Sequence, residues 1–180
     1  MWKPFDLDPN KKYPIITEVY PGPQYDLVPQ KFFDALYVMM LAQYGFVAVR
    51  FGNRGGSYLR SLKYSEYYRG NMRDYPLADN KAVIEQLADR YDFLDIDRVG
   101  IWSGSSGGYM PASVMLIHPD FYKVGVAGSG LHDPSIYWRW WSDQFQGVDK
   151  VITPDGETKW ITKKEQQRKN FRCGSLFVAD

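Results

Sequence analysis

The chain has 180 residues, of which 22 are basic and 21 acidic, so its formal net charge is +1. A nearly neutral chain creates no overall field that would attract nucleic acid or an anionic membrane, and we expect neither as a partner. Hydrophobic residues make up 44% of the chain and aromatic residues 17%, enough for one domain with a substantial core. The single cysteine, Cys173, excludes an internal disulfide.

The sequence offers no membrane segment and no metal site. The longest apolar run, around 37–42, is far shorter than the roughly 18 residues that cross a bilayer. The first residues include Lys3, Asp6 and Asp8 in place of an apolar core, so we do not expect a signal peptide, and the compartment stays open. No group of His, Cys and Asp has the spacing of metal ligands, and we expect no cofactor.

Predicted strands and helices alternate along most of the chain. Apolar and β-branched runs predict strands over 13–20, 46–51, 99–103 and 124–127. Helical spacing of apolar residues predicts helices over 30–44 and 76–91, and the composition of 109–117 predicts a third. This order indicates an α/β fold with a mostly parallel sheet and helices on both faces, in one domain over 1–180.

The last third of the chain has a different pattern. It contains an aromatic cluster over 136–141, then a predicted hairpin over 151–161 around a Pro-Asp-Gly turn. A charged helix is predicted over 163–169, and the beginning of one more strand over 176–179.

The strongest local signal is the segment SGSSGG at 103–108, between a predicted strand and a predicted helix. In α/β-hydrolases a strained turn of this kind carries the nucleophile, and the residues two before and two after it must be small. The turn also directs the next backbone N–H toward the reacting carbonyl at a helix N-terminus. Two registers fit, one centred on Ser105 and one on Ser106, and a glycine-rich turn without catalytic function is the third interpretation.

Several stretches, in the same order, resemble the catalytic domain of the prolyl oligopeptidase/dipeptidyl peptidase IV family. They are PFDLDPNKKYPIITEVYPGP, FGNRGGS, DYPLADNKAVIEQL, DIDRVGIWSGSSGGYM and GLHDPSIYWRWWSDQFQG, and they cover nearly the whole chain. The resemblance selects the register of Ser105. The sequence departs from the family pattern at Gly52, where the family usually has Asp.

The resemblance implies an α/β-hydrolase fold and a serine peptidase that forms an acyl-enzyme on a peptide substrate, often after proline. Ser105 would be the nucleophile, and the backbone N–H of Ser106 and the hydroxyl of Tyr20 would bind the oxyanion. Tyr137 and Trp141 match the aromatic residues that line the pocket for the residue before the scissile bond. Without the resemblance, Tyr20 would be interpreted as an ordinary tyrosine at the end of a strand. Tyr137 and Trp141 would be interpreted as part of the core or of an interface. Full-length homologues are expected to be homo-oligomers.

The catalytic base and acid are not identified in this chain. In this fold they follow the serine in the order Asp, then His. His118 and His132 come too early in the chain to match the family's histidine. Asp180 is a candidate for the acid, but no histidine follows it. The propeller domain of the family has no counterpart either. We therefore expect an incomplete domain that is inactive alone. An esterase or lipase of the same fold, or a remnant without catalytic activity, are the alternatives.

Overall fold

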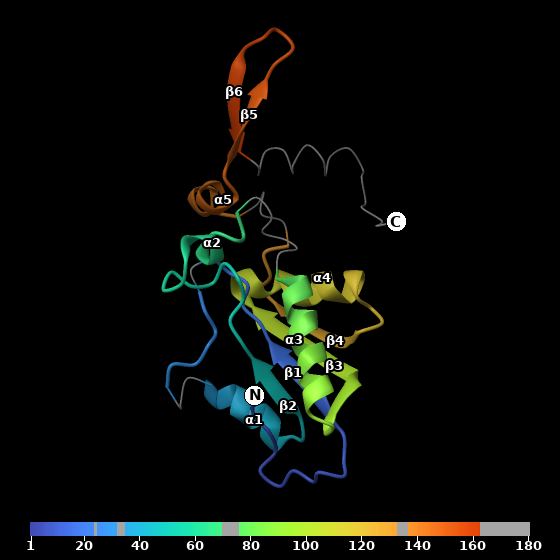
Figure 1. Ribbon diagram of the computed structural model, residues 1–180. Coiled ribbons are helices and arrows are strands. Elements are labelled where there is room, and N and C mark those ends of the chain that lie inside the picture. Colours follow the sequence, from blue (N-terminus) through green and yellow to red (C-terminus); the bar gives the residue numbers. More distant parts are fainter. Residues whose placement is uncertain (24, 32–34, 70–75, 133–136, 163–180) are drawn as a thin grey trace. The chain divides into compact units, whose positions relative to one another are not determined.

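The computed structural model describes residues 1–23, 25–31, 35–69, 76–132 and 137–162 (Figure 1). The chain divides into two compact units. The first comprises Met1–Tyr67 and Arg73–Leu131, and the second comprises Tyr68–Met72 and His132–Asp180.

A parallel sheet forms the centre of the first unit. Its four strands have the order β2-β1-β3-β4, and every neighbouring pair is parallel. The four predicted strands are all present, although β3 begins five residues before the predicted start. Their bounds are Tyr13–Glu18 for β1, Val47–Arg50 for β2, Leu94–Gly104 for β3 and Tyr122–Gly128 for β4.

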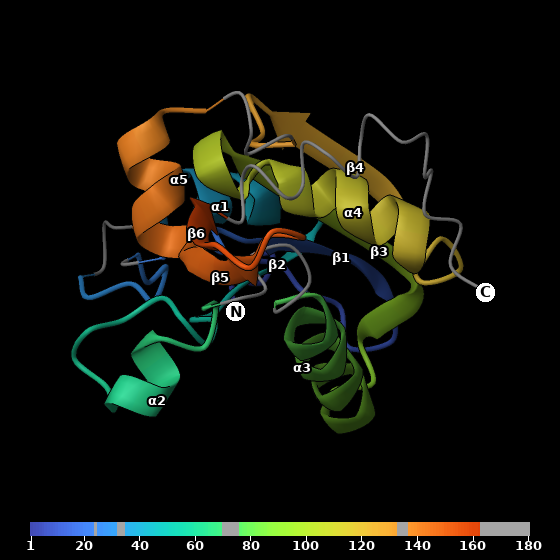
Figure 2. The ribbon, with the colours of Figure 1, turned by 90° about the horizontal axis from the view of Figure 1, so that it is seen from above.

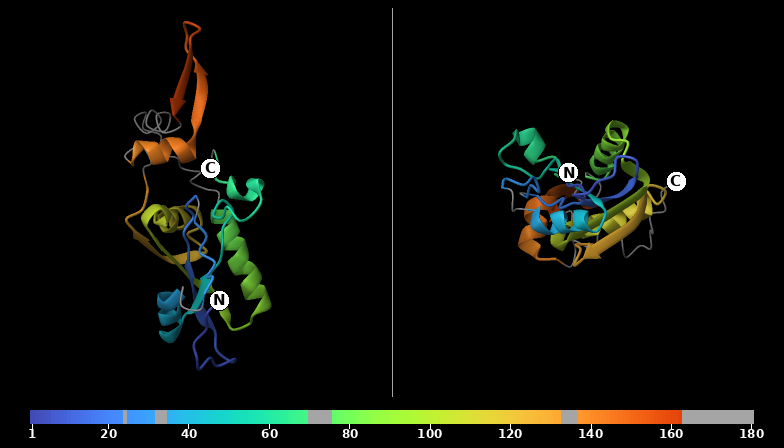
Figure 3. Two further views of the ribbon diagram at one scale, coloured as in Figure 1. Left: turned by 90° about the vertical axis from the view of Figure 1, so that its left-hand side faces the viewer. Right: turned by 90° about the horizontal axis from the view of Figure 1, so that it is seen from below.

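Helices cover both faces of this sheet, as the sequence predicts. Because side chains alternate along a strand, Ile15 and Val19 of the β1 segment pack in one apolar cluster with residues of α3 (Leu77–Arg90) and α4 (Tyr109–Ile117). Ile16 packs on the other face, beside residues of α1 (Leu36–Gln43). The views from above and from below show α1 and α3 on opposite sides of β1 and β2 (Figures 2 and 3). The α/β fold is thereby confirmed.

A buried polar network ties α3 to the sheet. The hydroxyl of Tyr122 in β4 donates to Asn80 Oδ1 at 2.7 Å, and Asn80 Nδ2 donates to Thr17 Oγ1 in β1 at 3.3 Å. Tyr122 is fully buried, and desolvation raises the pKa of its hydroxyl. The three side chains therefore satisfy one another in the core, where an unpaired polar group would be costly.

The carboxyl ends of β1, β3 and β4 lie at one edge of the sheet. Register pairs join Glu18 to Trp102 and Gly104 to Gly128 at the ends of these strands. In open parallel sheets the ligand binds outside this edge. A wide hollow of about 520 Å³ beside Lys12, Glu85 and Leu94 lies at the opposite, amino end of the strands, which makes it a poor candidate for the site.

The second unit contains a helix and a hairpin. Helix α5 (Arg139–Gln146) precedes β5 (Val148–Ile152) and β6 (Thr158–Thr162), which pair in antiparallel fashion. The turn between them has Gly156 at φ 84°, a conformation that suits glycine. The predicted hairpin is thus present. The helix predicted over 163–169 and the strand predicted over 176–179 lie outside the described residues. None of the described helices is long and apolar enough to cross a membrane.

Candidate active site

Ser105 lies on the turn that joins β3 to α4. Residues Ser105–Gly107 form a single 3-10 turn directly after the last residue of β3. Ser105 has φ 54°, a left-handed conformation that a residue with a β-carbon rarely adopts. Strained backbone of this kind persists where the surrounding structure enforces it, and it is the conformation of a nucleophile elbow.

The packing around the turn differs between the residues that flank Ser105 and those that flank Ser106. A β-carbon added to Gly107 would lie 2.6 Å from Ser103 Oγ and 3.0 Å from the Cα of Tyr20. A β-carbon added to Gly104 would meet only the carbonyl oxygen of Gly128, at 3.7 Å. The close approach therefore joins Ser103 and Gly107, the positions two before and two after Ser105. This is the packing that the register of Ser105 requires.

Gly108 needs to be glycine for a different reason. Its added β-carbon would lie 2.5 Å from the carbonyl oxygen of Gly128 and 2.9 Å from the Cα of Gly130. These two residues end β4 and begin the loop after it. The start of α4 is therefore packed against the ends of both neighbouring strands, with Gly107 facing the β1 side and Gly108 the β4 side.

Tyr20 lies two residues beyond the end of β1, in the segment that packs on the turn. The carbonyl of Tyr20 accepts the N–H of Gly22 at 2.8 Å, and its ring packs on Tyr25 with 4.8 Å between centroids. A β-carbon added to Gly22 would lie 2.9 Å from Tyr20 Cε1 and 3.1 Å from Ser106 Oγ. The Tyr20 ring and the Ser106 hydroxyl therefore both lie close to Gly22, and Ser105 is the residue before Ser106 in the chain.

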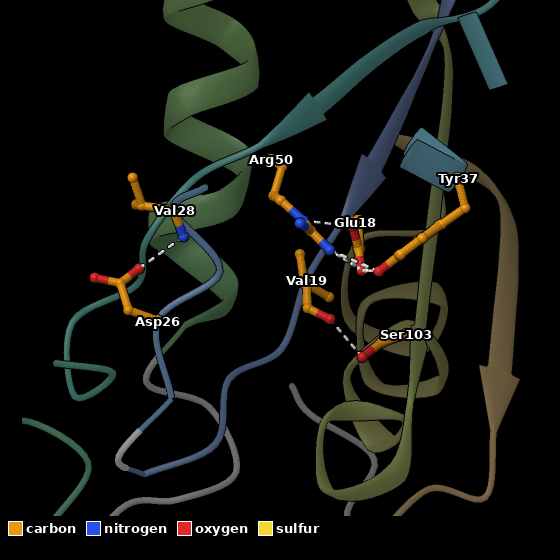
Figure 4. Close-up of polar contacts among 7 residues, drawn as sticks. All are labelled: Glu18, Val19, Asp26, Val28, Tyr37, Arg50 and Ser103. Carbon is orange, nitrogen blue, oxygen red and sulfur yellow. Dashed lines mark hydrogen bonds and ion pairs between the residues drawn. The ribbon is translucent and has the colours of Figure 1, made fainter. Parts of the chain in front are cut away.

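Below this segment, Ser103 joins the ends of β3 and β1. Its hydroxyl donates to the carbonyl oxygen of Val19 (Figure 4), and its side chain is buried. The Val19 N–H in turn donates to the carbonyl of Trp102 at 3.2 Å. The residue before Tyr20 is thus held to β3 through both of its backbone polar groups.

A buried ion pair lies on the opposite face of β1 from Val19. Arg50 Nε lies 2.6 Å from Glu18 Oε2, and both side chains are about 6% exposed. Tyr37 of α1 donates its hydroxyl to Glu18 and accepts a bond of 2.6 Å from Arg50 Nη2 (Figure 4). The ring of Tyr37 also meets Trp102 edge-on, with 5.1 Å between centroids. This cluster fixes the end of β1 against β2, β3 and α1.

The charges in this cluster change the ionisation of its members. Burial, together with the hydrogen bond to Glu18, raises the pKa of Tyr37 to about 12. Burial alone would lower the pKa of Arg50, but the hydrogen bond and charge of Glu18 outweigh it and raise that pKa. Both groups therefore keep their protons throughout the neutral range. We assign the cluster a structural function, because neither group can exchange a proton there.

Tyr137 and Trp141 belong to the second unit, whereas Ser105 belongs to the first. They contact each other edge-on, with 5.2 Å between ring centroids. Trp141 then packs on Phe145 at 5.2 Å, and Phe145 packs on Tyr68 at 5.9 Å. Phe145 is the most buried of these rings, at 4% exposed, and the sequence analysis missed it. The spacing of four between Tyr137, Trp141 and Phe145 was the signal that could have found it.

His118 does not complete a triad with Ser105. His118 ends α4, where its N–H donates to the carbonyl of Val114 at 2.8 Å. The nine residues of α4 separate it from the turn by about 13 Å. His132 is exposed and belongs to the second unit, and Asp180 lies outside the described residues. Among the residues that the structure describes, no cluster of acidic, His or Cys side chains could hold a metal ion.

Comparisons with known proteins all lead to the same family. The model of the prolyl oligopeptidase family matches residues 31–172. Human dipeptidyl peptidase 8 is 35% identical over 149 residues, which are 82% of this chain and 16% of that protein. Mouse prolyl endopeptidase FAP is 25% identical over 145 residues, 81% of this chain and 19% of its own length. The chain thus spans less than a fifth of the length of these curated relatives.

A solved structure is similar as well. The crystal structure of a dipeptidyl aminopeptidase IV candidate from Bacteroides ovatus superposes with a TM-score of 0.63 at 29% sequence identity. The superposition covers 73% of this chain and 18% of that chain.

Proposed function

Because this chain belongs to the prolyl oligopeptidase family, we propose that it is part of the catalytic domain of a serine peptidase whose nucleophile is Ser105. The relatives named above are dipeptidyl peptidases and a prolyl endopeptidase. We propose the same reaction class for the native polypeptide that carries this chain, namely hydrolysis of a peptide bond through an acyl-enzyme.

The conformation of Ser105 is the observation that carries this proposal. Its positive φ and the close approach of Ser103 to Gly107 are what a nucleophile elbow requires. The turn also lies at the carboxyl edge of the parallel sheet, where ligands bind in folds of this class. A glycine-rich turn without catalytic function would not need a serine in a left-handed conformation.

The mechanism follows from this placement. Ser105 Oγ attacks the scissile carbonyl while a general base takes its proton, and the amine leaves with a proton from the same base. The backbone N–H of Ser106 and the hydroxyl of Tyr20 donate hydrogen bonds to the oxyanion that forms. Water then hydrolyses the acyl-enzyme. The base and its acid are proposed to come from parts of the native polypeptide outside this chain, in the family order.

The substrate class rests on the aromatic residues of the second unit. We propose that Tyr137 and Trp141 line the pocket for the residue before the scissile bond. They contact each other edge-on, and the face of an aromatic ring is a flat apolar surface that suits the ring of proline. The assembly of full-length relatives into homo-oligomers stays a prediction, which the mass of the native protein in light scattering would test.

The experiment compares two substrates on the native polypeptide. One is a dipeptide ending in proline and joined to p-nitroaniline, and the other is a short-chain p-nitrophenyl ester. We expect hydrolysis of the amide, and a loss of about 10⁴- to 10⁶-fold in Ser105→Ala. Ser106→Ala is the matched control and should keep its activity, because only its backbone N–H is used.

Two results would contradict the proposal. Hydrolysis of the ester without the amide would indicate an esterase of the same fold. Absence of both activities in a folded native polypeptide would indicate a protein without catalytic function. A third arm uses the same amide with a blocked amino terminus, and its hydrolysis would distinguish an endopeptidase from a dipeptidyl peptidase.

A further inference from the structure

Ser103 has a buried hydroxyl that the proposed mechanism does not use. Its side chain is 3% exposed and its hydroxyl donates to the carbonyl oxygen of Val19. The bond joins residues far apart in the chain, and it lies between the two segments that carry Ser105 and Tyr20 (Figure 4).

The accepting carbonyl belongs to the peptide unit that links Val19 to Tyr20. A peptide unit is planar, so a hydrogen bond to its oxygen fixes the orientation of the whole unit. The regular pairing of β1 with β3 ends at Glu18 and Trp102, and only the Val19 N–H continues it. The Ser103 hydroxyl therefore supplies the last tie to β3 before Tyr20, which begins the turn toward Gly22.

The Ser103 hydroxyl depends on its neighbour being glycine. A β-carbon on Gly107 would lie 2.6 Å from Ser103 Oγ, so glycine at 107 leaves free the space that this hydroxyl occupies. Glycine and alanine would fit equally well at position 103. Serine is the residue that fits and also donates a hydrogen bond, and a buried hydroxyl without an acceptor would destabilise the fold.

We propose that Ser103 is a positioning residue for the oxyanion site: its bond to the Val19 carbonyl holds Tyr20 in the orientation in which the phenol can donate to the oxyanion. This inference rests on the proposed function, because it needs Ser105 as the nucleophile and Tyr20 as a donor. Ser103 itself touches no reacting atom. Its effect on catalysis passes through Tyr20.

A double-mutant cycle tests this dependence on the native polypeptide. Its variants are Ser103→Ala, Tyr20→Phe and the double variant, each assayed for kcat and KM on the amide substrate. We expect Tyr20→Phe to lower kcat about 10²-fold, and Ser103→Ala to lower it about tenfold with KM changed less than about twofold. In the Tyr20→Phe background, Ser103→Ala should lower kcat by less than about twofold.

Equal losses from Ser103→Ala in both backgrounds would overturn the inference, because a merely structural bond acts independently of the phenol. No loss in either background would also overturn it. Ser103→Gly, which leaves even more room, should behave as Ser103→Ala does, and thermal melting checks that each variant is folded. Ser105→Ala separates the two proposals. If Ser105→Ala keeps the activity, the proposed function fails; if it removes the activity and the cycle is additive, only this inference fails.

Discussion

Gly107 faces Ser103 across the turn that carries Ser105, so closely that a β-carbon on Gly107 would lie 2.6 Å from Ser103 Oγ. The end of β3 and the turn that leads into α4 therefore pack closely at these two residues. Gly104 and Gly108 do not meet in this way, since their nearest neighbours are in the β4 segment. The turn is thus built around Ser105.

This packing predicts different costs for two alanine substitutions in the same turn. Gly107→Ala should lower the free energy of unfolding by about 1–3 kcal/mol, because the new methyl group overlaps Ser103 and the backbone of Tyr20. Gly104→Ala should change it by less than about 0.5 kcal/mol, since its new methyl group makes only an ordinary contact. Urea unfolding of both variants measures the difference. Equal costs would contradict this packing, and a larger cost for Gly104→Ala than for Gly107→Ala would favour the register of Ser106.

A second close approach joins Gly52 to Asp26. A β-carbon on Gly52 would lie 2.5 Å from Asp26 Oδ1, and the same oxygen accepts the N–H of Val28 at 3.1 Å. Figure 4 shows the bond that holds this carboxylate in place. The side chain of Asp26 thus occupies the space into which a side chain at position 52 would extend.

The two positions should therefore be coupled. We expect Gly52→Ala to cost about 1–3 kcal/mol of unfolding free energy alone, and about 1–2 kcal/mol less in the Asp26→Ala background. Asp26→Asn is the control, because it removes the charge but keeps the size and shape of the side chain, so the full cost of Gly52→Ala should remain. Additive costs in the Asp26→Ala background would show that the contact does not limit residue 52.

The Glu18–Arg50 pair predicts a large loss of stability when one partner is removed. Glu18→Ala leaves the charge of Arg50 buried without its counterion, and we expect a cost of about 3–5 kcal/mol. The exposed pair of Glu157 and Lys159 is the control, and Glu157→Ala should cost less than about 1 kcal/mol. Chemical unfolding of both variants measures the costs. Similarly small costs for Glu18→Ala and Glu157→Ala would contradict a buried ion pair between Glu18 and Arg50.

Tyr37 predicts the pH dependence of this cluster. Its pKa is raised from 10.0 to about 12, so the unfolded chain loses this proton first as the pH rises. The stabilisation is therefore complete below about pH 10 and is lost between about pH 10 and pH 12. Denaturant midpoints should fall across this range, and they should fall less steeply in Tyr37→Phe. Parallel pH profiles for the two proteins would show that Tyr37 does not contribute.

Much of the fold could be predicted because it depends on local patterns. Apolar runs predicted the four strands, helical spacing predicted α1 and α3, and composition predicted α4. Two helices were missed. Helix α2, Leu62–Ser65, is a single turn capped by Ser61, too short for a periodic signal. Helix α5 begins inside the aromatic run over 136–141, which was interpreted as a cluster, so the spacing of four that continues to Phe145 was overlooked.

The candidate site was predictable only in part. The glycine and serine pattern indicated a turn at Ser105 but fitted two registers, and the backbone conformation and packing that support our proposal of Ser105 are features of the folded chain. Glu18, Arg50 and Tyr37 come from β1, β2 and α1, so only the folded arrangement brings them together. The same holds for Ser103 and Val19. Such contacts between distant segments leave no periodic pattern in the sequence.

Covalent labelling of the serine tests the central claim most directly. The native polypeptide would be treated with a fluorophosphonate probe, and the modified peptide would be located by mass spectrometry in the wild type, Ser105→Ala and Ser106→Ala. Our account predicts an adduct on Ser105 that is lost in Ser105→Ala and retained in Ser106→Ala. Labelling that survives Ser105→Ala and disappears in Ser106→Ala would contradict it.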